Sequence, residues 1–324
     1  MGEGRGAQRR SAERPGRRPR QKGDARLKAC LRPRLPRRGP PRPRRPWRPL
    51  AAPGGGRDNE RVDRRDDLDR IRRALLLGGD ILRAFHRRRV RVRYKAHGSP
   101  VTEADLAADE AIRRELPRAD ESWLSEESAD DPARLARRRV WIVDPLDGTR
   151  EFLEGVPDWC VSIGLAEDGV AVAGGVYAPA REELYLGSPE TGATLNDRPV
   201  AASDRATLEG AVVLVNRWAL RRPGGRRLEE RGFHVRAVGP LAYTLALVAA
   251  GRADATWSPS SKAEWDIAAG VALVVAAGGH ASDWRFSPLG FNRWPPRTPG
   301  LVACGARLAP ALRELIASDR PGHR

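Results

Sequence analysis

The sequence predicts an α+β fold in which helices and strands form two layered halves, the first of which ends near residue 200. Two patterns predict it. Apolar residues recur at helical spacing in some segments, and short apolar or alternating runs typical of strands fill others. The strand-like runs follow one another before residue 200 and alternate with helix-like segments after residue 210. The chain has 324 residues, 40% of them hydrophobic, which is enough to build a substantial core.

The elements of the first half can be assigned in order. An amphipathic helix is expected where the apolar residues Leu68, Ile71, Leu75, Leu82 and Phe85 alternate with Arg and Asp. A strand at 90–94 leads to a second helix at 101–116, with Thr102 as its N-cap. Further strands are expected at 123–125, 140–143, 160–166 and 170–179. Asp168-Gly169 is a typical hairpin turn, so these strands are expected to form an antiparallel meander.

The second half alternates between the two kinds of element. It begins with an expected strand at 210–216. Helices are expected at 226–231, 240–250, 263–277 and 309–317. No internal repeat is present in the sequence.

The first 57 residues differ in composition from all that follows. They contain 19 Lys and Arg against three acids, so they carry +16 of the formal net charge of +17. Ten prolines prevent a continuous helix, and the apolar residues are too few to offset the entropy of ordering. We therefore predict a disordered Arg/Pro-rich tail at 1–60, an N-terminal half at 61–200 and a C-terminal half at 201–319.

Two other interpretations of the tail stay open. An Arg-rich tail would bind the phosphate backbone of a nucleic acid without reading its sequence, so a nucleic-acid-binding protein acting through residues 1–57 is the alternative from a different functional class. The second interpretation is a misassigned start, because Met1 is the only methionine and the codon of Val62 can initiate translation in bacteria.

The cysteines and the hydropathy pattern bear on location. Cys30, Cys160 and Cys304 are far apart and form neither a disulfide framework nor a CxxC metal pair, which fits a reducing cytoplasm. No run of about 18 apolar residues exists, so we expect no membrane contact. We expect a cytoplasmic protein, and the sequence leaves a homodimer open.

The stretch VWIVDPLDGT at 140–149 places two carboxylates where an apolar strand ends. Burying Asp144 and Asp147 there would be strongly unfavourable without cations. Oxygen ligands favour Mg²⁺ or Mn²⁺ over zinc, and no His or Cys lies nearby. If Pro145 holds the turn, both carboxylates and the Leu146 carbonyl can converge on one point.

The residues that follow, Gly148 and Thr149, begin an expected helical turn whose free N–H groups favour a phosphate. Cations and phosphate together indicate phosphoryl hydrolysis. A plain polar turn explains D-P-L-D-G equally well, since Asp, Pro and Gly are common turn residues. Taken alone, Glu126-Glu127 in LSEES also fits a solvated charge pair, and Asp266 in EWDIAAG fits a helix N-cap.

Together, in the order EE, DPLDGT and WD, these motifs resemble those of the inositol monophosphatase family, the lithium-sensitive and Mg²⁺-dependent phosphomonoesterases. The resemblance covers roughly residues 60 to 317. It includes SPVTEAD at 99–105, which looks like the family's VTxxD element, with its Lys at Lys95. The resemblance implies a fold of α/β/α/β/α layers, two or three Mg²⁺ ions with Mn²⁺ as the alternative, and a small phosphorylated substrate.

The resemblance also implies roles for individual residues. The metal ligands would be Glu126, Asp144, Leu146 through its carbonyl, Asp147 and Asp266. Substrate phosphate would be held by Leu146, Asp147, Gly148, Thr149 and Asp266. The catalytic residues would be Asp105, Glu127 and Thr149, with Asp105 and Thr149 orienting a metal-activated water and Glu127 supporting the ligands. A competing aspartyl-nucleophile chemistry uses a DxDx[TV] motif, and the spacing of Asp144 and Asp147 argues against it.

Within the family, LSEES, DPLDGTREFL and SPVTEADLAADE look most like the bacterial 3'(2'),5'-bisphosphate nucleotidase branch. That branch removes the 3'-phosphate of 3'-phosphoadenosine 5'-phosphate, a by-product of sulfate assimilation. The inositol branch usually has a glutamate seven residues before the WD aspartate, where this chain has Pro259. The nucleotidase branch commonly has a Lys where this chain reads Ala242-Tyr243-Thr244, so inositol-1-phosphate phosphatase stays the alternative. Tyr243 and Trp257 are candidates either for stacking on adenine or for the core.

Overall fold

The computed structural model describes residues 63–86, 88, 90–95, 98–220 and 223–318, so the predicted tail lies outside the described residues. The helices are α1 (Arg65–His86), α2 (Glu103–Glu115), α3 (Thr149–Glu154), α4 (Arg217–Leu220), α5 (Pro223–Glu230), α6 (Leu241–Ala249), α7 (Ala268–Ala276) and α8 (Ala309–Ser318). Within these residues, no helix is both long and apolar enough to cross a membrane.

A seven-stranded sheet fills the first half in the order β3-β4-β5-β6-β7-β8-β9. Its strands are β3 (Ser122–Ser125), β4 (Arg139–Asp147), β5 (Cys160–Glu167), β6 (Val170–Ala178), β7 (Glu183–Ser188), β8 (Gly192–Leu195) and β9 (Arg198–Val200). From β4 onward every pair is antiparallel, as expected for a meander. The β3–β4 pair is parallel, so that part of the prediction was wrong, because the chain crosses over through residues 126–138 before β4 begins.

A five-stranded sheet fills the second half in the order β11-β10-β12-β16-β14. Its strands are β10 (Val212–Val215), β11 (His234–Ala237), β12 (Ala255–Ser258), β14 (Gly279–Ser282) and β16 (Leu301–Gly305). Two small sheets pair β1 (Val92–Tyr94) with β2 (Pro100–Thr102) and β13 (Lys262–Ala263) with β15 (Arg297–Thr298). The helix expected at 263–277 begins only at Ala268, because residues 262–263 pair with β15 instead.

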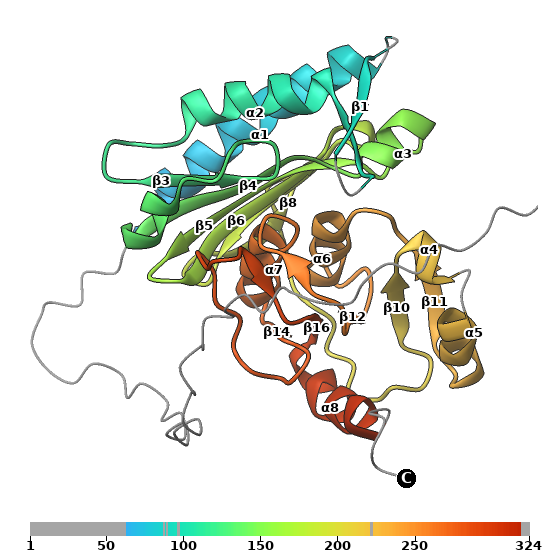
Figure 1. Cartoon of the computed structure of the whole chain (residues 1–324). Helices are drawn as coiled ribbons and strands as arrows, with labels where there is room; N and C mark the ends of the chain where they lie inside the picture. The colour runs from blue at the N-terminus through green and yellow to red at the C-terminus, as the bar shows by residue number, and fades with distance from the viewer. Residues whose placement is uncertain (1–62, 87, 89, 96–97, 221–222, 319–324) are drawn as a thin grey trace, which may run out of the picture. The chain divides into compact units, whose positions relative to one another are not determined.

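The helices and sheets alternate in layers, which confirms the predicted α+β layered fold (Figure 1). Helices α1 and α2 pack on one face of the seven-stranded sheet, and α6 and α7 lie between its other face and the five-stranded sheet. Helix α8 adds a small cluster with Leu308 and Leu312 on the five-stranded sheet. The largest cluster of buried residues therefore surrounds α6 and α7.

Close contact between α7 and the seven-stranded sheet depends on glycine in β6. A Cβ added at Gly174 would lie 2.6 Å from the Ala269 carbonyl oxygen and 2.8 Å from its Cα. Gly175, next in the strand, faces the other way, and a Cβ there would meet the methyl ends of Leu75 and Ile71. The backbone of α7 can therefore approach β6 only because residue 174 has no side chain.

Gly174→Ala is expected to reduce the free energy of unfolding by about 1–3 kcal/mol, because the new methyl group meets helix backbone that cannot rotate away. It should also displace α7 and the segment before it. Gly175→Ala is the matched control, with a smaller cost because flexible side chains can move. Urea unfolding of both variants checks this. Equal losses of stability would show that contact with the α7 backbone is not the constraint.

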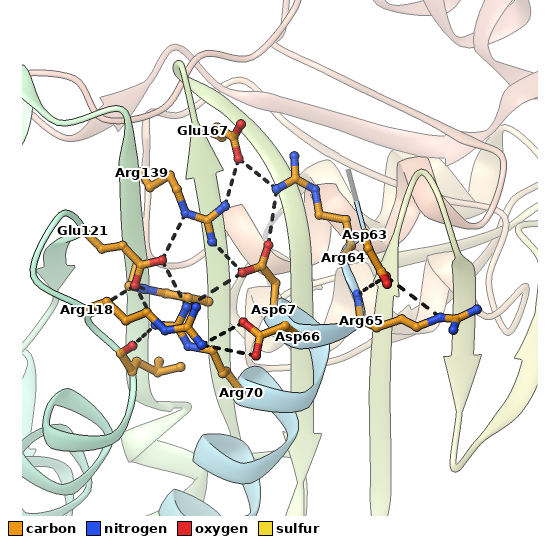
Figure 2. A network of polar contacts seen from close by, with 12 residues as sticks. Asp63, Arg64, Arg65, Asp66, Asp67, Arg70, Arg118, Glu121, Arg139 and Glu167 are labelled. Carbon is orange, nitrogen blue, oxygen red and sulfur yellow. Dashed lines mark hydrogen bonds and ion pairs between the residues drawn. The ribbon is translucent and has the colours of Figure 1, made fainter. Parts of the chain in front are cut away.

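A buried ion network attaches α1 to the β3–β4 side of the seven-stranded sheet (Figure 2). Arg70 donates to Glu121 Oε1 and Oε2 at 3.1 and 2.6 Å. Arg139 links Glu121 to Asp67 and Glu167, with N–O distances of 2.5–3.0 Å. Trp141 Nε1 donates to Glu121 Oε2 at 2.8 Å. The Glu121 and Arg70 side chains are only 2% and 3% exposed, so each charge depends on the others for compensation.

The network predicts acid sensitivity. Burial alone would raise the pKa of Glu121, but hydrogen bonds from Arg70 and Trp141 outweigh it and lower the pKa from 4.5 to about 2. A carboxylate with a lowered pKa stabilises the folded state above its unfolded pKa of 4.5 and loses that contribution as the pH falls toward 2. We expect roughly 3 kcal/mol to be lost over that range. Unfolding of Glu121→Gln should differ from the parent at pH 7 and converge with it in acid. A pH-independent difference would contradict the assignment.

Candidate active site

The DPLD segment forms a bulge at the end of β4. Asp144 pairs with Ser162 and Asp147 with Cys160, and the register shifts between these two pairs. Pro145 lies in the shifted segment and has no N–H to donate to the ladder. Leu146 N instead donates to Asp144 Oδ1 at 3.0 Å. The stretch is therefore an irregular extension of the strand rather than a turn after it, and such bulges redirect side chains.

Three carboxylates from distant parts of the chain meet beside this bulge. One oxygen each from Glu126, Asp144 and Asp266 lies within 4.8 Å of the other two. Glu126 directly follows β3, Asp144 is in β4, and Asp266 precedes α7. Burial, and then the negative charge of Glu126, raises the pKa of Asp144 well above its ordinary value. The same two causes raise the pKa of Asp266 to about 7. The cluster thus concentrates negative charge in a small volume.

Lys95 binds the acidic pair next to the cluster. Its Nζ donates to Glu126 Oε1 at 2.7 Å and to Glu127 Oε1 at 2.8 Å. Burial raises the pKa of Glu127 to about 7, although the hydrogen bond from Lys95 acts in the opposite direction. Glu127 thus shares the Lys95 ammonium with Glu126, and its supporting role stays a prediction.

Asp147 lies in the same pocket but outside the group of three. Its Oδ2 accepts a hydrogen bond from Ala242 N at 2.7 Å, at the start of α6. Burial, and then repulsion from Asp266, raises the pKa of Asp147 well above its ordinary value. Asp147 thus connects the end of β4 to the first turn of α6. Its role as a metal ligand stays a prediction.

The predicted pair Asp105 and Thr149 is in contact. Thr149 Oγ1 lies 3.1 Å from Asp105 Oδ1 and 3.2 Å from the Leu146 carbonyl oxygen, and these acceptors compete for its one proton. Asp105 is fully buried in the first turn of α2, where its Oδ2 accepts from Thr102 N at 2.8 Å. Thr102 is the helix N-cap, as predicted, and the two residues form a capping box. Burial raises the pKa of Asp105.

Gly148 lines the pocket where the chain passes close to Pro240. Its φ of +96° is a left-handed conformation, and a Cβ there would lie 2.7 Å from Pro240 Cγ. The cavity of about 190 Å³ is lined by the acidic cluster, the DPLDGT segment and residues from distant parts of the chain. Its lining residues are Ser99, Pro100, Glu126, Asp144, Leu146, Asp147, Gly148, Thr149, Arg150, Glu151, Gly239, Pro240 and Asp266.

The donor set fits a hard divalent cation. Every side-chain donor in the cluster is a carboxylate, and mutual repulsion would be relieved by a positive ion between them. Glu126, Asp144 and Asp266 would hold such an ion, with Asp147 and the Leu146 carbonyl adjacent. His and Cys, the usual zinc ligands, are absent from the pocket lining given above.

Sequence reasoning missed the buried connection behind the site. Arg134, fully buried, donates to Asn292 Oδ1 at 2.7 Å and to the Arg293 carbonyl at 2.9 Å. The N–H groups of Asn292 and Arg293 donate to the Glu264 carboxylate at 2.7 and 2.9 Å. This connection joins the crossover before β4 to the segment that carries Asp266. The available signal was Glu264 in the E-W-D triplet. A glutamate next to an aromatic residue and an apolar helix is expected to be buried, and a buried carboxylate requires hydrogen-bond partners.

The comparisons with known proteins agree with this geometry. The family model "Inositol monophosphatase family" matches residues 67–323. The chain is 36% identical over 242 residues to the inositol-1-monophosphatase of Rhizobium meliloti (strain 1021), a match that covers 72% of this chain and 88% of that protein.

Solved structures show the same fold. The extragenic suppressor protein suhB from Bartonella henselae superposes with a TM-score of 0.68 at 30% identity, covering 79% of this chain and all of that one. CysQ from Bacteroides thetaiotaomicron, described as a bacterial member of the inositol monophosphatase family, has a TM-score of 0.62 at 26% identity. That match covers 74% of this chain and 97% of CysQ.

Proposed function

This chain belongs to the inositol monophosphatase family and is a phosphoric monoester hydrolase, and from that premise we propose that it removes the 3'-phosphate of 3'-phosphoadenosine 5'-phosphate. The products would be AMP and phosphate. The substrate assignment depends on the identity of one residue, Pro259, which lies seven positions before Asp266 and would face the substrate. At the position where the inositol branch has a glutamate, this chain has the exposed Pro259, whose side chain has no acceptor for hydrogen bonds from sugar hydroxyls.

The metal site is part of the proposal. Glu126, Asp144, Asp147, Asp266 and the Leu146 carbonyl would hold Mg²⁺, with Mn²⁺ as the alternative. A divalent ion bound there would lower the pKa of a water molecule and offset negative charge on the phosphoryl oxygens. The raised pKa values of Asp144 and Asp266 support this assignment, because the site favours any positive charge, proton or metal, that enters it.

The protein's own groups would orient the attacking water. The Thr149 hydroxyl, donating to Asp105 Oδ1 at 3.1 Å, keeps its lone pairs available to accept a hydrogen bond from that water. Asp105 is held in turn by Thr102, so the pair has little freedom to rotate. Gly148 and Thr149 line the pocket where the phosphoryl oxygens would lie. A protein nucleophile is unnecessary in this arrangement.

The aromatic residues considered for adenine stacking do not support it. Tyr243 is 3% exposed and donates its hydroxyl to Glu183 Oε2 at 2.8 Å, so it belongs to the core. Trp257 packs on Phe233 with ring centroids 5.8 Å apart. Recognition of the nucleotide would therefore depend on its phosphates more than on its base.

Inositol 1-phosphate is the second candidate substrate, favoured by the named activity of the Rhizobium meliloti relative. The test is a comparison of kcat/KM for 3'-phosphoadenosine 5'-phosphate, inositol 1-phosphate and fructose 1,6-bisphosphate in Mg²⁺, measured by phosphate release on one preparation. We expect the nucleotide to be preferred. A clear preference for inositol 1-phosphate would overturn the substrate assignment and leave the phosphatase chemistry intact.

A further inference from the structure

Lysine is rare in this protein, and its positions are informative. Only four of the 59 Lys and Arg residues are lysines, namely Lys22, Lys28, Lys95 and Lys262. The two that fall in the described residues, Lys95 and Lys262, both lie near the acidic cluster. Lysine presents a compact charge with three donors, whereas arginine presents a planar fork, so the two residues suit different ligands.

The two lysines differ in how their charge is compensated. Lys95 forms ion pairs with Glu126 and Glu127. Lys262 is only partly exposed, and within the described part of the chain it forms no ion pair. Its Nζ donates to Ser260 Oγ at 3.1 Å, and Ser260 Oγ lies 2.9 Å from Ser258 Oγ. A row of two hydroxyls and one ammonium thus follows the end of β12, with a positive charge at its end.

Arg297 adds a second positive charge on the neighbouring strand. In the small sheet, Ala263 pairs with Arg297 and Lys262 with Thr298. The Arg297 side chain is held by Ser261, with Nε donating to Oγ at 3.1 Å and Nη2 to the carbonyl at 3.3 Å. Lys262 and its strand precede Asp266 closely in the chain, and Arg297 lies on the strand paired with it, so both cations flank the segment that carries this pocket carboxylate.

The pocket itself offers little to a second anionic group. Its titratable lining residues are the acids Glu126, Asp144, Asp147, Glu151 and Asp266, and Arg150 as the lining cation. A phosphate bound at the acidic cluster would have metal ions as partners, but a second phosphate beyond the reach of those ions would be repelled by the acids. The second phosphate therefore needs a separate cation. A partly buried ammonium that forms no ion pair with a carboxylate is suitable, because its charge is available to the phosphate.

We propose that Lys262, assisted by Arg297, binds a second phosphate on the substrate and so selects bisphosphates over monophosphates. The inference deepens the proposed function and rests on it, since 3'-phosphoadenosine 5'-phosphate carries such a group on its 5' carbon. The Ser258 and Ser260 hydroxyls contribute donors beside the ammonium. Pro259, between them, keeps the loop free of the carboxylate that would repel that phosphate.

The test compares matched substrates that share the scissile phosphate. The measured quantity is the ratio of kcat/KM for 3'-phosphoadenosine 5'-phosphate to that for adenosine 3'-phosphate. Lys262→Met should lower this ratio by about 10- to 100-fold, the effect of a lost charge-assisted hydrogen bond, with little change for the monophosphate. Lys262→Arg should restore part of the ratio. Arg307→Met, at an exposed arginine in the 3₁₀ turn Ala306–Leu308, is the control and should change neither value.

Each other result has a defined meaning. Equal losses on both substrates of a pair, no loss on either, or loss of the ratio in Arg150→Met but not in Lys262→Met would overturn the inference if the sugar pair described next behaves in the same way. So would a parent enzyme that prefers the bisphosphate in neither pair. The same comparison with fructose 1,6-bisphosphate and fructose 1-phosphate separates the two proposals. A Lys262-dependent preference found only with the sugar pair would support the second-phosphate site while overturning the nucleotide substrate.

Discussion

Asp147→Asn is expected to lower kcat/KM by roughly a thousandfold, since a lost ligand charge at a metal-assisted site removes several kcal/mol of transition-state stabilisation. The fold should be retained, because the asparagine carbonyl can still accept the hydrogen bond from Ala242 N. Repulsion with Asp266 should decrease, so the metal-free variant should be at least as stable as the parent. Activity assays and thermal melts with and without Mg²⁺ measure both effects.

The control for this prediction is Asp197→Asn. Asp197 is exposed and pairs with Arg72 on the surface of α1, so the same chemical change should leave activity and the Mg²⁺ response unaltered. Asp147 was predicted as a ligand from the sequence but lies outside the three carboxylates that converge most closely. If Mg²⁺ raises the melting temperature of Asp147→Asn as much as that of the parent, Asp147 is not a ligand.

Arg70→Met should cause the largest loss of stability among single substitutions in the ion network of Figure 2. It removes both hydrogen bonds to Glu121, the bond to the Leu116 carbonyl and the contact over the Trp141 ring, whose centroid lies 4.9 Å from the guanidinium carbon. Glu121 would keep Arg139 and Trp141 as partners but would lose its main counter-charge. We expect the free energy of unfolding to fall by about 3–5 kcal/mol, as for a buried charge left without its partner.

Arg72→Met on the same helix is the matched comparison. Its pair with Asp197 is largely exposed, so its loss should cost about 1 kcal/mol or less. Urea unfolding at pH 7 gives both values. A loss at Arg70 no greater than at Arg72 would show that the network contributes little to attaching α1, whatever its geometry.

Local chemistry was readable from the sequence wherever neighbouring residues determine it. Thr102 as an N-cap follows from its position before an amphipathic run, and the structure confirms it. The acids of DPLDGT were recognisable because two carboxylates end an apolar strand. By contrast, nothing local to Ala242 indicates that its N–H binds Asp147, 95 residues away. Gly239 and Pro240 are on the pocket wall for the same long-range reason.

The errors in the predicted fold have similar causes. The expected helix begins too early at residue 263, because residues 262–263 pair with residues 297–298 in a small sheet, and that partner strand lies far along the chain. The parallel β3–β4 pair depends on the path of the crossover, about which strand periodicity carries no information. In both places the local sequence pattern was ambiguous, and pairing with a strand distant in the sequence determined the structure.

The convergence of Glu126, Asp144 and Asp266 has a consequence for how the protein unfolds. Two of these acids extend from the seven-stranded sheet, and the third precedes the helix that lies between the sheets. An ion bound to all three has its full affinity only when both layers are folded, so its binding free energy becomes coupling between them. The buried cluster around α6 and α7 already joins the two sheets, so the ion adds to a coupling that packing supplies. The layers should then melt in one sharper transition in Mg²⁺ and in a broader transition at lower temperature in a chelator. Metal concentration would thus set the cooperativity of unfolding as well as its midpoint.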